Sequence, residues 1–257
     1  MKISFKYIFS ALSLSLVVFM AACGKDDTAV PTSSRLRLFH AVADAPVAGV
    51  DVMLDGSVLS FRTFLTAGTV LADSSFKYRA GFPGVTDSSY LSLTDGAHNL
   101  KILPLGGTTP VLTQDITVAA GKSYTGFVID TLAKVGFLLV EDALPTTKQG
   151  KAFVRVAHLA PNAGSVDVVL RYVRTVNGVL TTLDSTSFGT NLPYKTVSNF
   201  IEAKASSTDS ITVEFRKAGT LTSAVVQAKS VLVPGRCYTG VAVGKTALLT
   251  NNFIHGR

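Results

Sequence analysis

Two histidines and two aspartates recur at matching places in the sequence and are the first candidates for chemistry. His40 ends a run of alternating apolar residues, and Asp51 lies in the next such run. His158 and Asp167 repeat this arrangement in the second half of the chain. A histidine close to a carboxylate is suited to acid–base catalysis or to metal binding. The sequence therefore raises the question of a reaction centre present in two copies.

The surrounding residues argue against such a centre. A metal site needs three or four converging ligands, and the spacing of the chain's four histidines and of its acids does not provide them. Asp44, Asp51 and Asp55 lack the dense spacing of a calcium loop. We predict no catalytic residue, no metal and no cofactor. Two interpretations stay open for the matched His and Asp residues and Asp44: a binding site in the loops, or hydrogen bonds that fix those loops.

Residues 1–22 have the pattern of an export signal. Lys2 and Lys6 precede an apolar run over residues 8–20, and two alanines follow it. This run is shorter than a stable membrane-spanning helix requires, and its flanks are those of a cleaved signal peptide. We expect cleavage directly before Cys23.

The segment Met20-Ala21-Ala22-Cys23 resembles the lipobox of bacterial lipoproteins. The resemblance implies that Cys23 becomes the mature N-terminus and carries acyl chains, two or more of which anchor a protein firmly. Lys25-Asp26-Asp27 resembles the short acidic export tag of some Gram-negative lipoproteins. That resemblance implies the outer membrane and the cell surface, with the periplasmic face as the alternative. Residues 23–34 are then a lipidated cysteine and a flexible tether.

The chain beyond this tether is a duplication. Five blocks recur in the same order, and a period this long predicts tandem domains rather than a solenoid. We place the repeats at residues 35–147 and 148–257. The matching blocks are Leu36–His40 with Val154–His158, Val50–Leu54 with Val166–Leu170, Tyr90-Leu91 with Phe200-Ile201, Gly121–Gly126 with Gly235–Gly240, and Phe137–Asp142 with Ala247–Asn252.

Each repeat is predicted to be a β-sandwich. Short alternating runs are separated by turn residues such as Asp95-Gly96 and Asn177-Gly178, and no segment has a helical period over ten residues. This pattern favours an all-β chain of two Ig-like sandwiches, with small Greek-key barrels as the alternative. The predicted strands are 35–39, 49–54, 57–62, 88–93, 97–103, 111–118, 122–129 and 134–140, then 152–157, 166–175, 178–184, 198–203, 210–216, 223–232, 236–243 and 246–250.

Charge and aromatic residues narrow the function further. The net charge is +7, but the basic residues are scattered, so we predict no nucleic-acid partner. Arg37 and Arg216 are expected on solvated strand faces. The matched Tyr124 and Tyr238 are predicted to bond the backbone at a corner of each sandwich. Among the aromatics of residues 76–90, core packing is the default, and stacking on sugar rings is the alternative.

The repeat resembles the domain of unknown function 4397 family, which is common in extracellular bacterial proteins. The resemblance rests on a Leu/Val-Arg-Leu/Val-x-His strand, the Asp44-Ala45-Pro46 loop and a Val-Asp-Val strand. The second copy has Asn162-Ala163-Gly164 in place of Asp-Ala-Pro. The resemblance implies a β-sandwich at the cell surface or in the periplasm, without an established activity.

These features predict a non-enzymatic lipoprotein whose tandem sandwiches bind or scaffold an envelope protein or an extracellular glycan. Loops 41–49 and 159–165 are the expected binding surface, because rigid strands there display the connecting segments. Attachment to the membrane is expected through the N-terminal lipid. Two alternatives stay open: a hydrolase or metal-dependent enzyme on the same scaffold, and a structural spacer.

Overall fold

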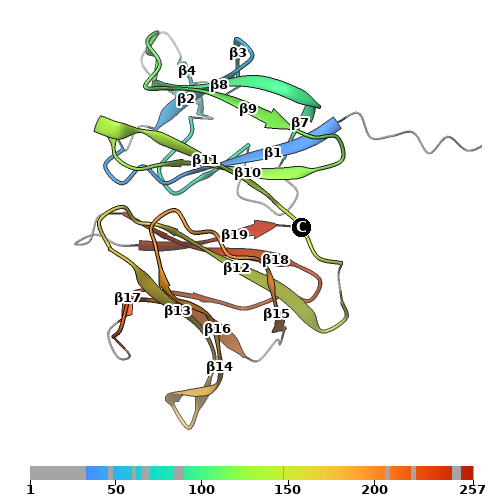
Figure 1. Ribbon diagram of the computed structural model, residues 1–257, viewed down its shortest axis with the longest axis vertical. Helices are drawn as coiled ribbons and strands as arrows, with labels where there is room; N and C mark the ends of the chain where they lie inside the picture. Colours follow the sequence, from blue (N-terminus) through green and yellow to red (C-terminus); the bar gives the residue numbers. More distant parts are fainter. Residues whose placement is uncertain are drawn as a thin grey trace, which may run out of the picture. The chain divides into compact units, whose positions relative to one another are not determined.

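The computed structural model describes most of the chain beyond residue 32 (Figure 1). The described residues are 33–45, 49–59, 62–64, 70–73, 75–83, 90–146, 148–205, 209–220, 224–244 and 250–256. They belong to one compact unit, Pro31–Arg257. Among them, no helix has the length and apolarity needed to cross a bilayer. The expected signal peptide, Cys23 and Lys25-Asp26-Asp27 lie outside the described residues.

The first repeat is a sandwich of two sheets. One sheet has the order β11-β10-β1-β6, with β7 also pairing with β1, and the other has the order β3-β2-β8-β9. Their facing apolar side chains, such as Leu36, Val52 and Leu100, form the core. The strands are β1 (Ser33–His40), β2 (Val50–Leu54), β3 (Ser57–Val58), β4 (Arg62–Phe64), β5 (Val70–Asp73), β6 (Gly81–Phe82), β7 (Leu91–Thr94), β8 (Gly96–Pro104), β9 (Leu112–Val118), β10 (Ser123–Ile129) and β11 (Gly136–Glu141), with a 3-10 turn η1 (Leu132–Lys134).

The second repeat has the same arrangement. Its sheets have the orders β15-β12-β18-β19 and β14-β13-β16-β17. In both repeats the first strand pairs in parallel with a late strand, β1 with β10 and β12 with β18. Since the two sheets of each repeat are separate, the sandwich prediction is confirmed and the barrel alternative is not. The strands are β12 (Lys151–Leu159), β13 (Val166–Val176), β14 (Val179–Leu192), β15 (Ile201–Lys204), β16 (Ser210–Lys217), β17 (Ala224–Ser230), β18 (Cys237–Val243) and β19 (Thr250–Gly256).

Two strand predictions need correction. The short strands β4, β5 and β6 were not predicted, because their two to four residues are too few to show a period. The last predicted strand, 246–250, lies outside the described residues except for Thr250, and β19 continues from there to Gly256. The ladders pair Gly126 with Leu139 and Gly240 with Phe253, so Leu139 corresponds to Phe253 and not to Leu249. An apolar run does not set strand register by itself, whereas the hydrogen-bonded ladder does.

Four strands are buried on both of their faces. In β1, Leu36 and Leu38 point into the first sandwich, whereas Phe39 points the other way and is equally buried. The outward residues of β1 and β10 pack against outward residues of β12 and β18, forming an inter-repeat core. Parallel strand pairs are usually covered on both faces, and here each repeat covers the pair of the other. The inter-repeat core contains Phe39, Ala41, Phe127, Ile129, Ala157, Leu159, Val241 and Val243.

The recurring Tyr-Thr-Gly segment begins with a structural tyrosine. The hydroxyl of Tyr124 accepts a hydrogen bond from the backbone N–H of Ala119 at 3.2 Å. The hydroxyl of Tyr238 accepts one from Val233 at 2.9 Å. Each tyrosine thereby closes the turn five residues before it, which confirms the predicted corner.

The glycine of that segment allows a close approach between β10 and its neighbours. A Cβ at Gly126 would lie 2.8 Å from Cδ2 of Leu38 and would overlap the ring of Phe137. Gly136 on the adjacent strand has its nearest neighbours at 3.6 Å, which is ordinary contact.

We expect Gly126→Ala to lower the free energy of unfolding by about 1–3 kcal/mol, because an overpacked core shifts its side chains. Urea denaturation measures this change, and Gly136→Ala is the matched control with little expected effect. Equal stability of the two variants would contradict the close approach.

Candidate functional site

His40 is enclosed at the end of β1. It is 1% exposed, and its Nδ1 accepts a hydrogen bond from the backbone N–H of Val42 at 3.3 Å. Its ring lies 5.1 Å from the ring of Phe76, between centroids, and Nε2 has no hydrogen-bond partner among the described residues. Burial lowers the pKa of His40 to about 4, so the imidazole is neutral near pH 7. In this state it supports the loop that follows β1.

His158 occupies the equivalent place at the end of β12. Its Nε2 lies 2.7 Å from the carbonyl oxygen of Gly164, so this nitrogen carries the proton and donates. The ring contacts the edge of Tyr194 with centroids 6.1 Å apart. Burial lowers the pKa of His158 below its ordinary value. The donated bond ties the start of the 159–165 loop to its end.

The aspartates bind backbone amides. Oδ1 of Asp44 accepts from Leu132 at 2.7 Å, and Oδ2 of Asp51 accepts from Gly106 at 2.8 Å. The two oxygens of Asp167 accept from Asn191 at 2.7 Å and from Gly219 at 2.9 Å.

No hydrogen bond joins Asp51 to His40, or Asp167 to His158. The reason is strand alternation, because Asp51 lies between the core-facing Val50 and Val52 and therefore points out of the sandwich. The paired acid and base that the sequence raised are thus separated by the sheet. Within the described residues, no three His, Cys, Asp or Glu side chains converge as a metal site would require.

A different His–Asp pair forms between two turns and was not predicted. Nδ1 of His98 lies 2.6 Å from Oδ2 of Asp55, and Nε2 lies 2.9 Å from the carbonyl oxygen of Thr94. The hydrogen bond to Asp55 raises the pKa of His98. This pair joins the β2–β3 turn to the β7–β8 turn. The two residues meet because β2 pairs with β8, so no local sequence pattern predicts the His98–Asp55 pair.

Two buried arginines hold equivalent places at the inter-repeat core. Arg37 is 4% exposed, and its Nε donates to Oγ1 of Thr125 at 2.9 Å. Arg155 is 2% exposed, and its Nε donates to Oγ1 of Thr239 at 3.0 Å. The prediction of a solvated face is therefore wrong for Arg37, because the second repeat covers that face. It is also wrong for Arg216, which is 8% exposed and bonded to Glu214.

Asp142 of the first repeat lies between these two arginines. Its Oδ1 accepts a hydrogen bond from Nη2 of Arg155, and its Oδ2 lies 3.7 Å from Nε of Arg37. The hydroxyls of Thr125 and Tyr90 also donate to the carboxylate, the latter at 2.9 Å. Burial, together with the Asp142 charge, raises the pKa of Tyr90 and keeps its hydroxyl protonated. A buried charge is tolerated only when paired in this way, so Asp142 binds the repeats to each other.

We call Arg37, Tyr90, Thr125, Asp142 and Arg155 the arginine cluster. Each arginine also stacks on an aromatic ring of its own repeat, Arg37 on Tyr90 at 5.0 Å and Arg155 on Phe200 at 4.8 Å from the ring centroid. Tyr90 and Phe200 are matched residues of the duplication. The sequence held one signal for this cluster, which was an arginine between apolar residues at the same place in both repeats.

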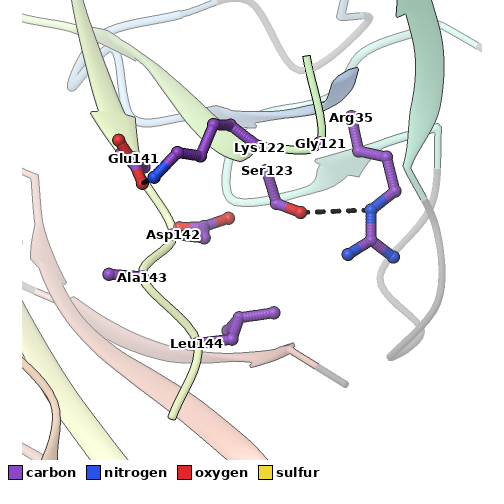
Figure 2. A pocket seen from close by; sticks show the side chains of 8 residues that line it. All are labelled: Arg35, Gly121, Lys122, Ser123, Glu141, Asp142, Ala143 and Leu144. Carbon is purple, nitrogen blue, oxygen red and sulfur yellow. Dashed lines mark hydrogen bonds and ion pairs between the residues drawn. The ribbon is translucent and has the colours of Figure 1, made fainter. Parts of the chain in front are cut away.

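A polar pocket of about 250 Å³ lies beside this cluster (Figure 2). Figure 2 shows Nε of Arg35 directed at Oγ of Ser123, at 3.1 Å, and Lys122 directed at Glu141, at 2.7 Å. The Ser123 hydroxyl accepts the hydrogen bond from the Arg35 guanidinium. Asp142, at the back of the pocket, is engaged in the arginine cluster. The pocket is therefore lined mainly by charged and polar groups that are already paired with one another.

The aromatic residues of the irregular segment face inward. Phe76 and Phe82 are 1% and 7% exposed and belong to the core of the first repeat. Tyr78 packs against the inter-repeat core, and Tyr90 lies under Arg35 and Arg37. The default of core packing holds, and these residues do not form an exposed platform for sugar rings.

Comparison with protein families identifies one family that matches the chain. The family described as "Domain of unknown function (DUF4397)" matches residues 34–169, which span the first repeat, β12 and the start of β13. The chain belongs to this family. No curated protein matches this DUF4397 protein.

Solved structures resemble the DUF4397 protein only distantly. A structure of family 41 carbohydrate-binding modules from streptococcal virulence factors has 11% identity and a TM-score of 0.26, over 85% of this chain and 96% of the other. A streptococcal ancillary pilin has 14% identity and a TM-score of 0.20, over 89% of this chain and 64% of the other. At such TM-scores the likeness carries no argument about function.

The buried His40 makes stability depend on pH. Because its pKa is lowered on folding, the unfolded chain takes up the proton first as the pH falls below 6.5, and stability is lost. Between pH 7.5 and pH 5 the wild type should lose about 2 kcal/mol more than His40→Asn, whose side-chain oxygen can still accept from Val42. Urea denaturation at both pH values measures the difference. The same pH dependence in both proteins would refute the buried neutral state.

Proposed function

We propose that this DUF4397 protein is a non-enzymatic lipoprotein of the outer membrane. Its two sandwiches act as one rigid scaffold that presents binding surfaces to an envelope protein. The observation that carries the proposal is the arginine cluster, in which a carboxylate of one repeat is buried against an arginine of the other. An enzyme keeps charged groups available to a substrate, whereas here they hold the scaffold together.

The contact between the repeats supports rigidity. Domains joined by small polar interfaces usually move relative to one another. Here eight apolar residues from both repeats form a common core, and the arginine cluster adds buried charges beside it. Movement between the repeats would expose the apolar residues to water. It would also separate the buried charges from their partners. The scaffold therefore fixes the distance and direction from the start of β1, which follows the tether, to the loops of both repeats.

A protein partner fits the described surface better than a glycan. Phe76, Tyr78 and Phe82 are turned into the cores, and the ring of Tyr90 is covered by two arginines, so these aromatics are already engaged. The exposed large apolar residues are instead aliphatic and lie mainly on strands and turns of the second repeat. They include Val176, Val179, Leu180, Leu183, Val231 and Val233. Aliphatic surface of this kind suits contact with another polypeptide.

The hydrolase and the metal-dependent enzyme are less well supported. His40 and His158 are buried with lowered pKa values, and Asp51 and Asp167 are bound to backbone amides. A general base must reach a substrate and exchange a proton near the working pH. Buried His40, with its pKa near 4, meets neither condition, and His158 is enclosed and bonded to a carbonyl oxygen. The structural spacer is the limiting case of the proposal, in which the scaffold positions a partner without a dedicated pocket.

Removal of the Asp142 charge tests the rigid scaffold. Asp142→Asn leaves two buried arginines without their counter-charge, so we expect a loss of about 3–5 kcal/mol in the free energy of unfolding. Calorimetry should then show the repeats unfolding separately, and protease should cut the segment between β11 and β12 faster. Glu141→Gln is the matched control, because it removes only the exposed pair with Lys122. A single transition with wild-type stability in Asp142→Asn would refute the scaffold.

Replacement of Cys23 tests the anchor. Cys23→Ser should abolish incorporation of labelled palmitate and release the protein from the membrane fraction. Replacing Lys25-Asp26-Asp27 by alanines should keep the label but reduce protease cleavage on intact cells. Protection of the wild type on intact cells would place it on the periplasmic face, and a labelled Cys23→Ser variant would refute lipidation at this residue.

A further inference from the structure

The edge strand β14 does not serve the core of its own sandwich along most of its length. Every residue from Val179 to Ser187 is exposed. Only the other end of the strand is held, where Phe188 and Leu192 pack against the core of the second repeat. A strand that covers a core alternates buried and exposed residues. The nine exposed residues lack this alternation, so their own sandwich does not explain them.

The hairpin of β13 and β14 also extends beyond its sheet (Figure 1). β16 pairs with β13 from Val166 to Val173, so among the described strands only β14 pairs with the last three residues of β13. A two-stranded ribbon is only marginally stable in water. This one nevertheless carries apolar side chains that are between 43% and 66% exposed. They are Val176, Val179, Leu180 and Leu183.

The first repeat provides an internal comparison. β3 holds the position that β14 holds in the second repeat, at the edge beside the second strand. β3 is two residues long, whereas β14 has fourteen. The sandwich therefore forms with a short edge, and the long edge is a separate addition to the second repeat.

This edge lacks the lysines and prolines that commonly prevent strands from associating. Lysine, inward charges and proline commonly protect exposed edges. The segment Val179–Leu192 contains no lysine, arginine or proline, and Asp184 is its only charge. Among the described strands, none pairs with the free side of β14.

We propose that β14 pairs antiparallel with β14 of a second copy of this chain, over Val179–Ser187. A nearly neutral strand of Thr, Ser, Val and Leu matches an identical strand in charge and in β propensity. A two-fold axis through Leu183 places Thr181 opposite Ser185 and Thr182 opposite Asp184, so that no like charges are directly opposed.

The bulge in β14 supports this axis. β13 pairs Val173 with Thr182 and Tyr172 with Asp184, which leaves Leu183 without a partner on β13. Leu183 is also the middle residue of the exposed segment. In the pair, the two Leu183 side chains meet at the axis and cover each other. An edge contact of nine residues is smaller than a standard interface, so the dimer is weak in solution. Anchoring both copies in one membrane raises their effective concentration.

Disulfide trapping tests the pairing. The full chain carries Cys23→Ser, so that its remaining natural thiol is the buried Cys237. Adding Leu183→Cys should give a covalent dimer on oxidation, because opposed residues at such an axis lie within disulfide range. Val58→Cys is the matched control, being 57% exposed on the equivalent edge of the first repeat. A dimer yield no higher than that of Val58→Cys would overturn the proposal.

Sedimentation tests the same contact without a covalent bond. The Cys23→Ser chain should dimerise as its concentration rises, Leu183→Lys should stay monomeric, and Val58→Lys should behave as the parent. A parent that stays monomeric at the highest soluble concentration would overturn the proposal. Self-association that persists in Leu183→Lys would also overturn the proposal. So would binding of the Cys23→Ser chain to lipid vesicles if that chain does not self-associate.

Discussion

The structure depends on a buried carboxylate that lies between two arginines where the repeats meet. Asp142 receives hydrogen bonds from Arg155, Thr125 and Tyr90 and lies beside Arg37. Around it, apolar residues of four strands close the contact. Removing any one of these charges from its partners would leave another buried without compensation. The two sandwiches are therefore not independent modules on a flexible chain.

The duplication has diverged where the repeats meet. Both repeats keep an arginine bonded to the threonine of the Tyr-Thr-Gly segment, but only the first has the acid. The ladders pair Tyr124 with Glu141 and Tyr238 with His255, so the residue equivalent to Asp142 is Gly256. One carboxylate thus pairs with two arginines, one from each repeat, so the two repeats are not equivalent at this contact.

The repeats also diverge at their outer edges. The short β3 and the long β14 occupy the same position in two sandwiches of the same strand order. The common framework accounts for the matched tyrosines, the loop-closing aspartates and the enclosed histidines. The differences lie on an edge that the common framework does not need. This separation is what we expect of a scaffold whose interior provides stability and whose additions provide contacts.

Much of the fold follows from local patterns. Alternation located most strands, and Asn177-Gly178 marks a turn because both residues adopt positive φ, at 51° and 79°. The Tyr-Thr-Gly segment predicted the corner, because its tyrosine hydroxyl accepts a hydrogen bond from a turn only five residues away. Such interactions span few residues, so the sequence by itself determined them. The backbone partners of Asp44, Asp51 and Asp167 lie far along the chain, so the sequence left open the choice between binding and loop fixing.

Only the tertiary structure decided which faces are covered. Alternation in β1 shows that Arg37 and Phe39 lie opposite to Leu36, but it does not show what packs against them. The partner of Arg37 is Asp142, and the partner of that pair is Arg155 in the next repeat. In the same way, the carboxylate that pairs with His98 is that of Asp55, 43 residues away in the sequence. Burial and charge pairing are set by chain segments that meet only after folding, and no local period encodes them.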